Sequence, residues 1–192
     1  MMLDQKVIDG LIRTMLDGGA DFCDVYCEKS AYNGVTADDR KINTSRSIQS
    51  GVGLRAVKNF NTYYTVCQDA TPENLAAAAG YLAAGLSVVS DTPRSPVILT
   101  FGREVSPLSG SKKDPEQVEI TDKTELIRSA QETAWGYSDK IKQVTARYSD
   151  FYRDVQIGSS ETGEISRQRL GLVEFMITVY AGDGSERQMG WA

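Results

Sequence analysis

The stretch Phe22-Cys-Asp-Val-Tyr-Cys-Glu28 decides how the N-terminal part of the chain folds. Its apolar residues, Cys23, Val25 and Cys27, occupy every second position, and more polar residues stand between them. Alternation with a period of two is typical of a strand that buries one face and exposes the other. We therefore expect a β-strand over residues 22–28.

The residues around this strand predict a helix before it and a sheet with a second helix after it. Apolar residues recur at three- and four-residue spacing from Val7 to Leu16, which indicates a helix with one buried stripe that ends at Gly18-Gly19. Thr71-Pro72 begins a second helix that runs to about Gly85, because a hydroxyl N-cap precedes proline at the first helical position. The alanines of this helix predict close packing on a sheet. The strands expected between the two helices cover residues 34–43, 48–57 and 63–67.

Residues 87–120 interrupt this pattern and then the same order of elements returns. Four prolines and a run of serine, glycine and lysine are typical of a connecting segment, in which only Val97–Phe101 is expected to form a strand. A helix is then expected near Asp122, whose spacing to Glu125 matches a capping box. The strands expected after it cover residues 141–148, 152–157, 168–180 and 186–191.

Helix, strands and hairpin therefore occur twice. We predict an α+β fold with an internal duplication, in which two similar helix-plus-antiparallel-sheet halves, residues 1–86 and 121–192, are joined by the Pro/Ser/Gly-rich connection 87–120. The chain stops at Trp191-Ala192, inside an expected strand. We therefore expect the second half to be truncated at its C-terminal end and the chain to be a fragment of a longer protein.

The composition excludes several classes of function. The 192 residues include no histidine, so the chain alone cannot form Ser-His-Asp triads, Cys-His dyads or histidine-ligated zinc sites. Its 21 basic and 26 acidic residues give a net charge of −5, which disfavours direct nucleic-acid binding. The longest apolar stretch, residues 75–89, is shorter than the roughly 20 residues of a membrane span. With three cysteines and no signal peptide, we expect a soluble, cytoplasmic protein without membrane contact.

Short motifs with catalytic spacing have ordinary structural interpretations here. Gly51-Val-Gly-Leu-Arg-Ala56 matches the dinucleotide fingerprint, but it lies in a strand pattern without the helix that binds the pyrophosphate. Ser109-Gly-Ser-Lys112 has S-x-x-K spacing within a loop. Acidic residues at 21, 24, 38 and 39 are expected on turns and at the surface. Cys23 and Cys27 would lie about 13 Å apart along one strand, too far for a disulfide or a shared metal ion. We predict no catalytic residue and no metal ligand.

Segments of the N-terminal half resemble the TldD/PmbA family, whose members are often called modulators of DNA gyrase. The first segment is Gly19-Ala-Asp-Phe-Cys-Asp-Val-Tyr-Cys-Glu28, and the second, after a polar strand, is Ser50-Gly-Val-Gly-Leu-Arg-Ala-Val57. Asp69-Ala-Thr-Pro-Glu-Asn-Leu-Ala-Ala-Ala78 is similar to the family's helix after the hairpin. The resemblance covers residues 19–86.

The resemblance implies a zinc metallopeptidase that acts on peptides and works as a homodimer or as a heterodimer with a related, zinc-less subunit. In this family an H-E-x-x-x-H motif and a further ligand bind zinc in a C-terminal region. None of those residues occurs here, so the resemblance implies zinc in a full-length parent protein and no cofactor in this chain.

We therefore expect the N-terminal scaffold of a TldD/PmbA-like zinc metallopeptidase without its catalytic half, and no activity in this chain alone. The alternative is a stand-alone, non-catalytic binding or assembly module, including the zinc-less partner subunit of such a peptidase. A peptidase must hold an extended peptide, and an exposed sheet edge does so by strand addition. Gly51 and Gly53 are the candidate substrate contacts, because glycine lets another backbone approach; a bulge in the sheet is their other interpretation.

Overall fold

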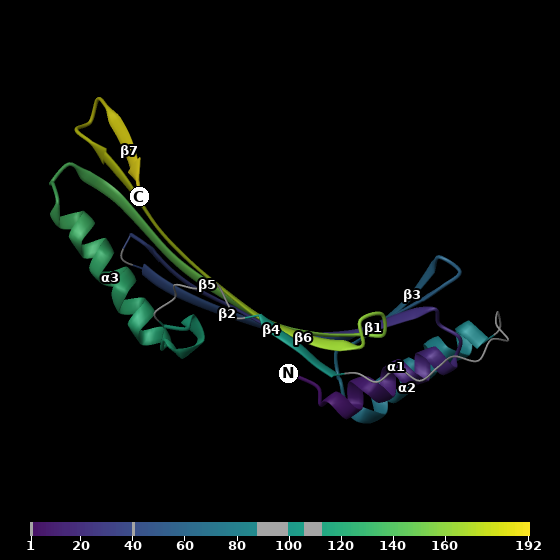
Figure 1. Cartoon of the computed structure of the whole chain (residues 1–192). Coiled ribbons are helices and arrows are strands. Elements are labelled where there is room, and N and C mark those ends of the chain that lie inside the picture. Colours follow the sequence, from purple (N-terminus) through teal and green to yellow (C-terminus); the bar gives the residue numbers. More distant parts are fainter. Residues whose placement is uncertain (1, 40, 88–99, 106–112) are drawn as a thin grey trace. The chain divides into compact units, whose positions relative to one another are not determined.

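The computed structural model describes residues 2–39, 41–87, 100–105 and 113–192 (Figure 1). It confirms the predicted α+β fold. The elements are, in order, α1 (Gln5–Asp17), β1 (Phe22–Asp38), β2 (Lys41–Lys58), β3 (Asn61–Cys67), α2 (Pro72–Ser87), β4 (Thr100–Val105), the 3-10 helix η1 (Pro115–Gln117), α3 (Ile120–Gly136), β5 (Ile141–Ser159), β6 (Glu164–Gly182) and β7 (Arg187–Trp191). Within these ranges, no helix has the length and apolar character needed to cross a membrane.

The strands form one sheet in the order β3-β2-β1-β5-β6-β4, and β7 also pairs with β6. The β2–β3 and β6–β7 pairs are antiparallel, as expected. The β4–β6 pair is parallel, which differs from the expectation of an antiparallel sheet. A parallel pair needs a long connection, and α3 and β5 lie between these two strands in the sequence.

The chain forms two compact units whose segments interleave along the sequence. Unit 1 consists of Met1–Ser30, Gln49–Pro107 and Arg153–Arg169, and unit 2 consists of Ala31–Ile48, Leu108–Tyr152 and Leu170–Ala192. The strands β1, β2, β5 and β6 each contribute residues to both units.

The compact units do not follow the order of the two expected sequence halves. The element order does repeat, because α1-β1-β2-β3 and α3-β5-β6-β7 are each a helix, two long strands and a shorter strand. This repetition supports the internal duplication, which stays a prediction together with the domain boundaries at residues 86 and 121.

Unit 1 is held together by the apolar stripe of α1. Its buried residues from Ile8 to Leu16 pack with Leu75 and Ala79 of α2 and with the apolar face of β1. The predicted alternation in β1 is confirmed, since Cys23, Val25 and Cys27 are fully buried. Burying one large apolar side chain stabilises a fold by roughly 1.5–3 kcal/mol, so the buried residues of this stripe stabilise unit 1.

The helices α1 and α2 lie side by side (Figure 1). A Cβ atom added to Gly18, at the end of α1, would stand 2.5 Å from the Cα atom of Ala83 in α2. The alanines of α2 therefore allow close packing against a helix as well as against the sheet. The predicted cap of α2 is also present, because the backbone N–H of Asn74 donates to Thr71 Oγ1 at 3.2 Å.

Several strands are longer than the sequence pattern indicated. The expected strand over residues 34–43 is wrong, since β1 continues through residues 29–33 and the chain turns at Asp38-Asp39. Asp39 has φ +42°, a left-handed conformation that aspartate tolerates better than most residues. The expected strands 141–148 and 152–157 are one strand, β5, because no proline or glycine separates them.

Two expectations in the middle of the chain are also corrected. The strand expected at Val97–Phe101 is observed as β4, Thr100–Val105, and residues 97–99 lie outside the described part. The capping box at Asp122 is wrong, because α3 begins at Ile120 with Glu119 as its N-cap residue and without a side-chain capping hydrogen bond.

The buried face of α3 includes polar residues. Ile127 is buried together with Lys123 and Gln131, whereas Leu126 is 50% exposed. The Gln131 amide donates to the Val144 carbonyl at 3.2 Å. The other buried partner, Lys123, belongs to the polar network described below.

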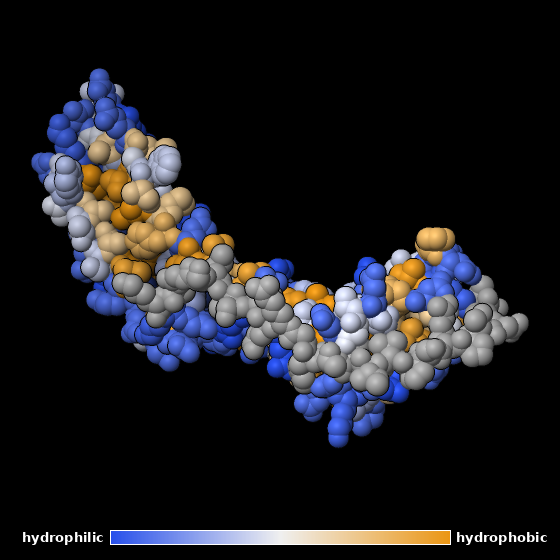
Figure 2. All heavy atoms as spheres, viewed as in Figure 1, coloured by the Kyte–Doolittle hydropathy of each residue, from blue (hydrophilic) through white to orange (hydrophobic). Residues whose placement is uncertain are grey.

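Exposed apolar side chains gather on β6 and β7 of unit 2. Figure 2 shows hydrophobic surface over the strands of this unit, and the exposed residues include Leu172, Val173, Phe175, Met189 and Trp191. By strand alternation and the β6–β7 pairing, Leu172, Met189 and Trp191 lie on one face of the sheet, and Val173 and Phe175 lie on the other. Groups of exposed apolar residues mark contact surfaces in many proteins.

Candidate functional site

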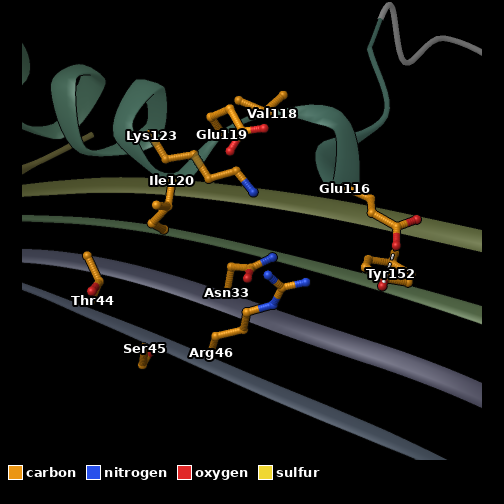
Figure 3. A pocket seen from close by; sticks show the side chains of 10 residues that line it. All are labelled: Asn33, Thr44, Ser45, Arg46, Glu116, Val118, Glu119, Ile120, Lys123 and Tyr152. Carbon is orange, nitrogen blue, oxygen red and sulfur yellow. Dashed lines mark hydrogen bonds between the residues drawn. The ribbon is translucent and has the colours of Figure 1, made fainter.

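Unit 2 contains a cavity of about 370 Å³ beside the first turn of α3 (Figure 3). The 3-10 helix η1, the residues after it and the start of α3 form one wall, and β1, β2 and β5 form the other. The residues that line the cavity are Asn33, Thr44, Ser45, Arg46, Glu116, Val118, Glu119, Ile120, Lys123 and Tyr152.

Lys123, which lines the cavity, forms a buried ion pair with Asp150. The Lys123 ammonium stands 2.5 Å from Asp150 Oδ2 and donates a hydrogen bond to the Pro115 carbonyl at 3.0 Å. The Asn33 amide donates to Asp150 Oδ1 at 2.7 Å. Lys123 and Asp150 are only 4% and 1% exposed. Because a buried charge without a partner costs several kcal/mol, this network holds the first turn of α3 at a fixed position on the sheet.

Tyr148 completes the network. Its ring centroid lies 5.7 Å from the Lys123 ammonium, an arrangement that favours the cation. Burial, together with a hydrogen bond to Asp150, raises the pKa of Tyr148 well above its ordinary range. The hydroxyl therefore stays protonated at neutral pH and acts as a donor to Asp150.

The other polar groups of the cavity differ in whether they have partners. The Tyr152 hydroxyl donates to Glu116 Oε1 at 2.6 Å, so these two side chains satisfy each other. The Arg46 guanidinium and the Glu119 carboxylate, by contrast, have no hydrogen bond or ion pair within the described part of the chain. The cavity therefore presents one free cation and one free anion.

The two glycines predicted to contact a substrate lie inside the sheet. Gly53 is paired with Val66 of β3, and β1 is the neighbour of β2 on its other side. A Cβ atom on Gly53 would stand 2.5 Å from the Tyr64 hydroxyl, and one on Gly51 would stand 3.3 Å from the Cys67 carbonyl. The Tyr64 side chain covers Gly53, although its exposed ring can move aside. Peptide binding at Gly51 and Gly53 is not tested by this geometry and stays a prediction.

The acidic residues considered in the sequence do not converge on one site. Asp24 pairs with Arg55, Asp21 accepts a hydrogen bond from the Asn59 backbone at 2.8 Å, and Asp38 accepts one from Thr145 at 3.0 Å. The S-x-x-K motif at Ser109–Lys112 lies outside the described residues.

The cysteines are unsuited to metal binding. Cys23 and Cys27 are free and buried, and Cys67 is free and partly exposed. Burial raises the pKa of the Cys23 thiol to about 12 and that of Cys27 to about 11, so both are neutral at pH 7, whereas metals bind the thiolate. In residues 2–39, 41–87 and 113–192, no three Cys, Asp or Glu side chains form a group that could hold a metal ion.

Sequence models of one protein family match both parts of the chain. The model of PmbA/TldA metallopeptidase domain 1 matches residues 23–83, and that of the PmbA/TldA metallopeptidase central domain matches residues 113–192. The chain belongs to the TldD/PmbA family. The second matched range begins at residue 113, inside the expected connection 87–120, and residues 84–112 lie between the two matched ranges.

A relative named as a metalloprotease is longer than this TldD/PmbA chain. Metalloprotease slr0863 of Synechocystis sp. is 29% identical over 179 residues, which cover 89% of this chain and 36% of that protein. The chain therefore spans little more than a third of this relative.

Solved structures of the family share the fold at 14% identity. Proteins named as modulators of DNA gyrase give TM-scores of 0.69 for Bacteroides thetaiotaomicron and 0.74 for Thermotoga maritima, and TldE from Thermococcus kodakarensis gives 0.60. In the same order, the aligned regions cover 100%, 97% and 96% of this chain and 45%, 42% and 42% of the solved chains. At this identity they show the fold alone.

Sequence analysis missed the cavity and the ion pair beneath it. One available signal was the position of Lys123, four residues before Ile127 and eight before Gln131, on the buried face of α3. A lysine on the apolar stripe of a helix implies a buried partner, although the sequence does not identify Asp150 as that partner.

We predict that Lys123→Met lowers the free energy of unfolding of unit 2 by about 3–5 kcal/mol, because Asp150 then stays buried without its counter-charge. The double variant Lys123→Met/Asp150→Asn should regain part of this loss. Lys41→Met, on an exposed residue of the same unit, is the control and should change stability by less than about 0.5 kcal/mol. Urea unfolding measures all three, and an equal effect of the substitutions at 123 and 41 would contradict the network.

We also predict that Cys67 alone reacts with a thiol reagent in the folded protein, and that all three cysteines react in denaturant. Burial raises the pKa of Cys23 and Cys27, so these thiols ionise near pH 9 only in the unfolded chain. The stabilisation from burying these two thiols in their neutral form is complete below pH 9 and is lost as the pH rises towards 11 or 12. Labelling of Cys23 or Cys27 as fast as Cys67 would show that they are not buried.

Proposed function

We propose that this chain is the non-catalytic N-terminal scaffold of a TldD/PmbA metallopeptidase that acts on peptides. The observation that carries the proposal is the order of the matched regions, in which domain 1 precedes the central domain of a metallopeptidase family. The relative named as a metalloprotease supports it, because this chain aligns with only 36% of that protein.

The residues of this chain do not fit the metal that the family implies. We propose zinc as the metal of the parent protein, and a hydrolytic zinc site takes three protein ligands, which commonly include histidine. The chain has no histidine, its two buried thiols are protonated, and the described acidic residues lie apart. We therefore assign no step of peptide hydrolysis to this chain.

We further propose that the parent works in the cytoplasm as a homodimer or as a heterodimer with a related subunit. The exposed apolar residues on β6 and β7 support a protein contact, since leaving them in water is unfavourable. The net charge of −5 supports a partner other than nucleic acid.

The alternative is a stand-alone binding or assembly module, including the zinc-less subunit of such a peptidase. The genomic reading frame distinguishes the possibilities. A frame that continues with an H-E-x-x-x-H motif supports the proposed parent enzyme, and a continuing frame without that motif supports the zinc-less subunit. A stop after codon 192 supports the stand-alone module.

We predict that the purified chain holds no stoichiometric zinc and cleaves no peptide before or after zinc is added. Elemental analysis measures the metal, and a fluorescent peptide library measures cleavage, with a known zinc peptidase as the positive control. Stoichiometric zinc together with zinc-dependent cleavage by the 192-residue chain would overturn the proposal.

A further inference from the structure

The cavity in unit 2 carries free charges of both signs on a small concave surface. Its volume of about 370 Å³ lies at the lower end of the range of small-molecule sites, roughly 300–1,000 Å³. From its free groups we infer that the cavity binds a small zwitterion, namely a free amino acid or a dipeptide. This inference goes beyond the proposed function and does not depend on it, because it uses only the groups that line the cavity.

The charges in the cavity fall into paired and unpaired groups. The Lys123 ammonium is neutralised by Asp150, and the Glu116 carboxylate accepts a hydrogen bond from Tyr152. This leaves the Arg46 guanidinium and the Glu119 carboxylate to interact with a ligand. A guanidinium offers two parallel donors to a carboxylate, and a carboxylate accepts hydrogen bonds from an ammonium group.

Arg46 and Glu119 are the cation and the anion of the cavity that have no hydrogen bond or ion pair in the described part of the chain, and the Glu116 carboxylate keeps its negative charge beside the neutral Tyr152 hydroxyl. A positive and a negative group in one cavity favour a zwitterion over a singly charged ligand. A simple anion would pair with Arg46 but would be repelled by the negative charge of Glu119. A simple cation would pair with Glu119 but would be repelled by the positive charge of Arg46. A molecule with a carboxylate at one end and an ammonium group at the other satisfies both residues. Amino acids and dipeptides are the smallest biological molecules of this kind.

Asn33 and Lys123 of the cavity wall are held in place by Asp150, whereas Arg46 and Glu119 are exposed. Asn33 is 7% exposed and is fixed by its hydrogen bond to Asp150, which leaves its side-chain oxygen without a partner in the described part of the chain. That oxygen can accept a hydrogen bond from a ligand N–H group. Ile120, 40% exposed at the start of α3, adds an apolar surface for a ligand side chain. Figure 3 shows Asn33 and Arg46 on the strand side and Glu119 on the helix side.

Titration of the 192-residue chain with alanyl-alanine, followed by backbone NMR, tests the inference. We expect millimolar alanyl-alanine to shift the amide signals of Asn33, Arg46 and Glu119. Capping either charge, as acetyl-alanyl-alanine or as alanyl-alanine amide, should weaken binding at least about tenfold. Absence of shifts at these residues, or equal binding of the capped compounds, would overturn the inference.

Two variants assign each charge of the ligand to one residue. Arg46→Gln removes the partner of the ligand carboxylate, so this variant should bind alanyl-alanine amide as well as it binds alanyl-alanine. Glu119→Gln removes the partner of the ligand ammonium group, so this variant should bind acetyl-alanyl-alanine as well as it binds alanyl-alanine. Each variant should bind alanyl-alanine at least about tenfold more weakly than the natural chain. The matched controls are Arg13→Gln in α1 and Glu132→Gln on the exposed face of α3, which should leave binding unchanged. If either cavity variant keeps its affinity while its circular dichroism is unchanged, the assignment is wrong.

Discussion

The buried ion pair between Lys123 and Asp150 determines how α3 lies on the strands of unit 2. Two charges removed from water are favourable only if each has a close partner and further hydrogen bonds, and here Pro115, Asn33 and Tyr148 supply them. The pair therefore fixes the position of the start of α3 relative to the middle of β5. A cavity lined mainly by polar side chains lies beside this turn.

Unit 1 depends on a different interaction. Its helices present apolar stripes and small residues, so α1 and α2 pack on an alternating strand face whose inward residues are fully buried. The burial that stabilises this unit also keeps the Cys23 and Cys27 thiols protonated. The same packing that makes unit 1 a stable scaffold thus makes its thiols poor metal ligands.

Local periodicity was enough to predict the elements that bury a simple apolar pattern. The stripe of α1, the alternation at Cys23, Val25 and Cys27 and the hydroxyl cap at Thr71 all appear as the sequence indicated. The lengths of β1 and β5 were not predictable in this way, because polar residues in a strand weaken the pattern without ending the strand.

The cavity could not be predicted because it brings together residues that are distant in sequence. Asn33 and Arg46 come from the first two strands, whereas Glu119 and Lys123 come from the start of α3, more than 70 residues later. Asp150 is almost fully buried, and the sequence analysis did not single it out. No local pattern encodes such a pairing, which depends on the register between strands and on the placement of the helix.

We propose that this TldD/PmbA chain supplies a scaffold for catalytic residues that lie in another region of the parent protein. Mixing the chain with a separately produced family polypeptide that carries the H-E-x-x-x-H region tests this most directly. The account predicts zinc-dependent peptide cleavage by the mixture and none by this chain alone, with a much lower rate for the catalytic polypeptide alone. Equal cleavage by the catalytic polypeptide with and without this chain would contradict the account.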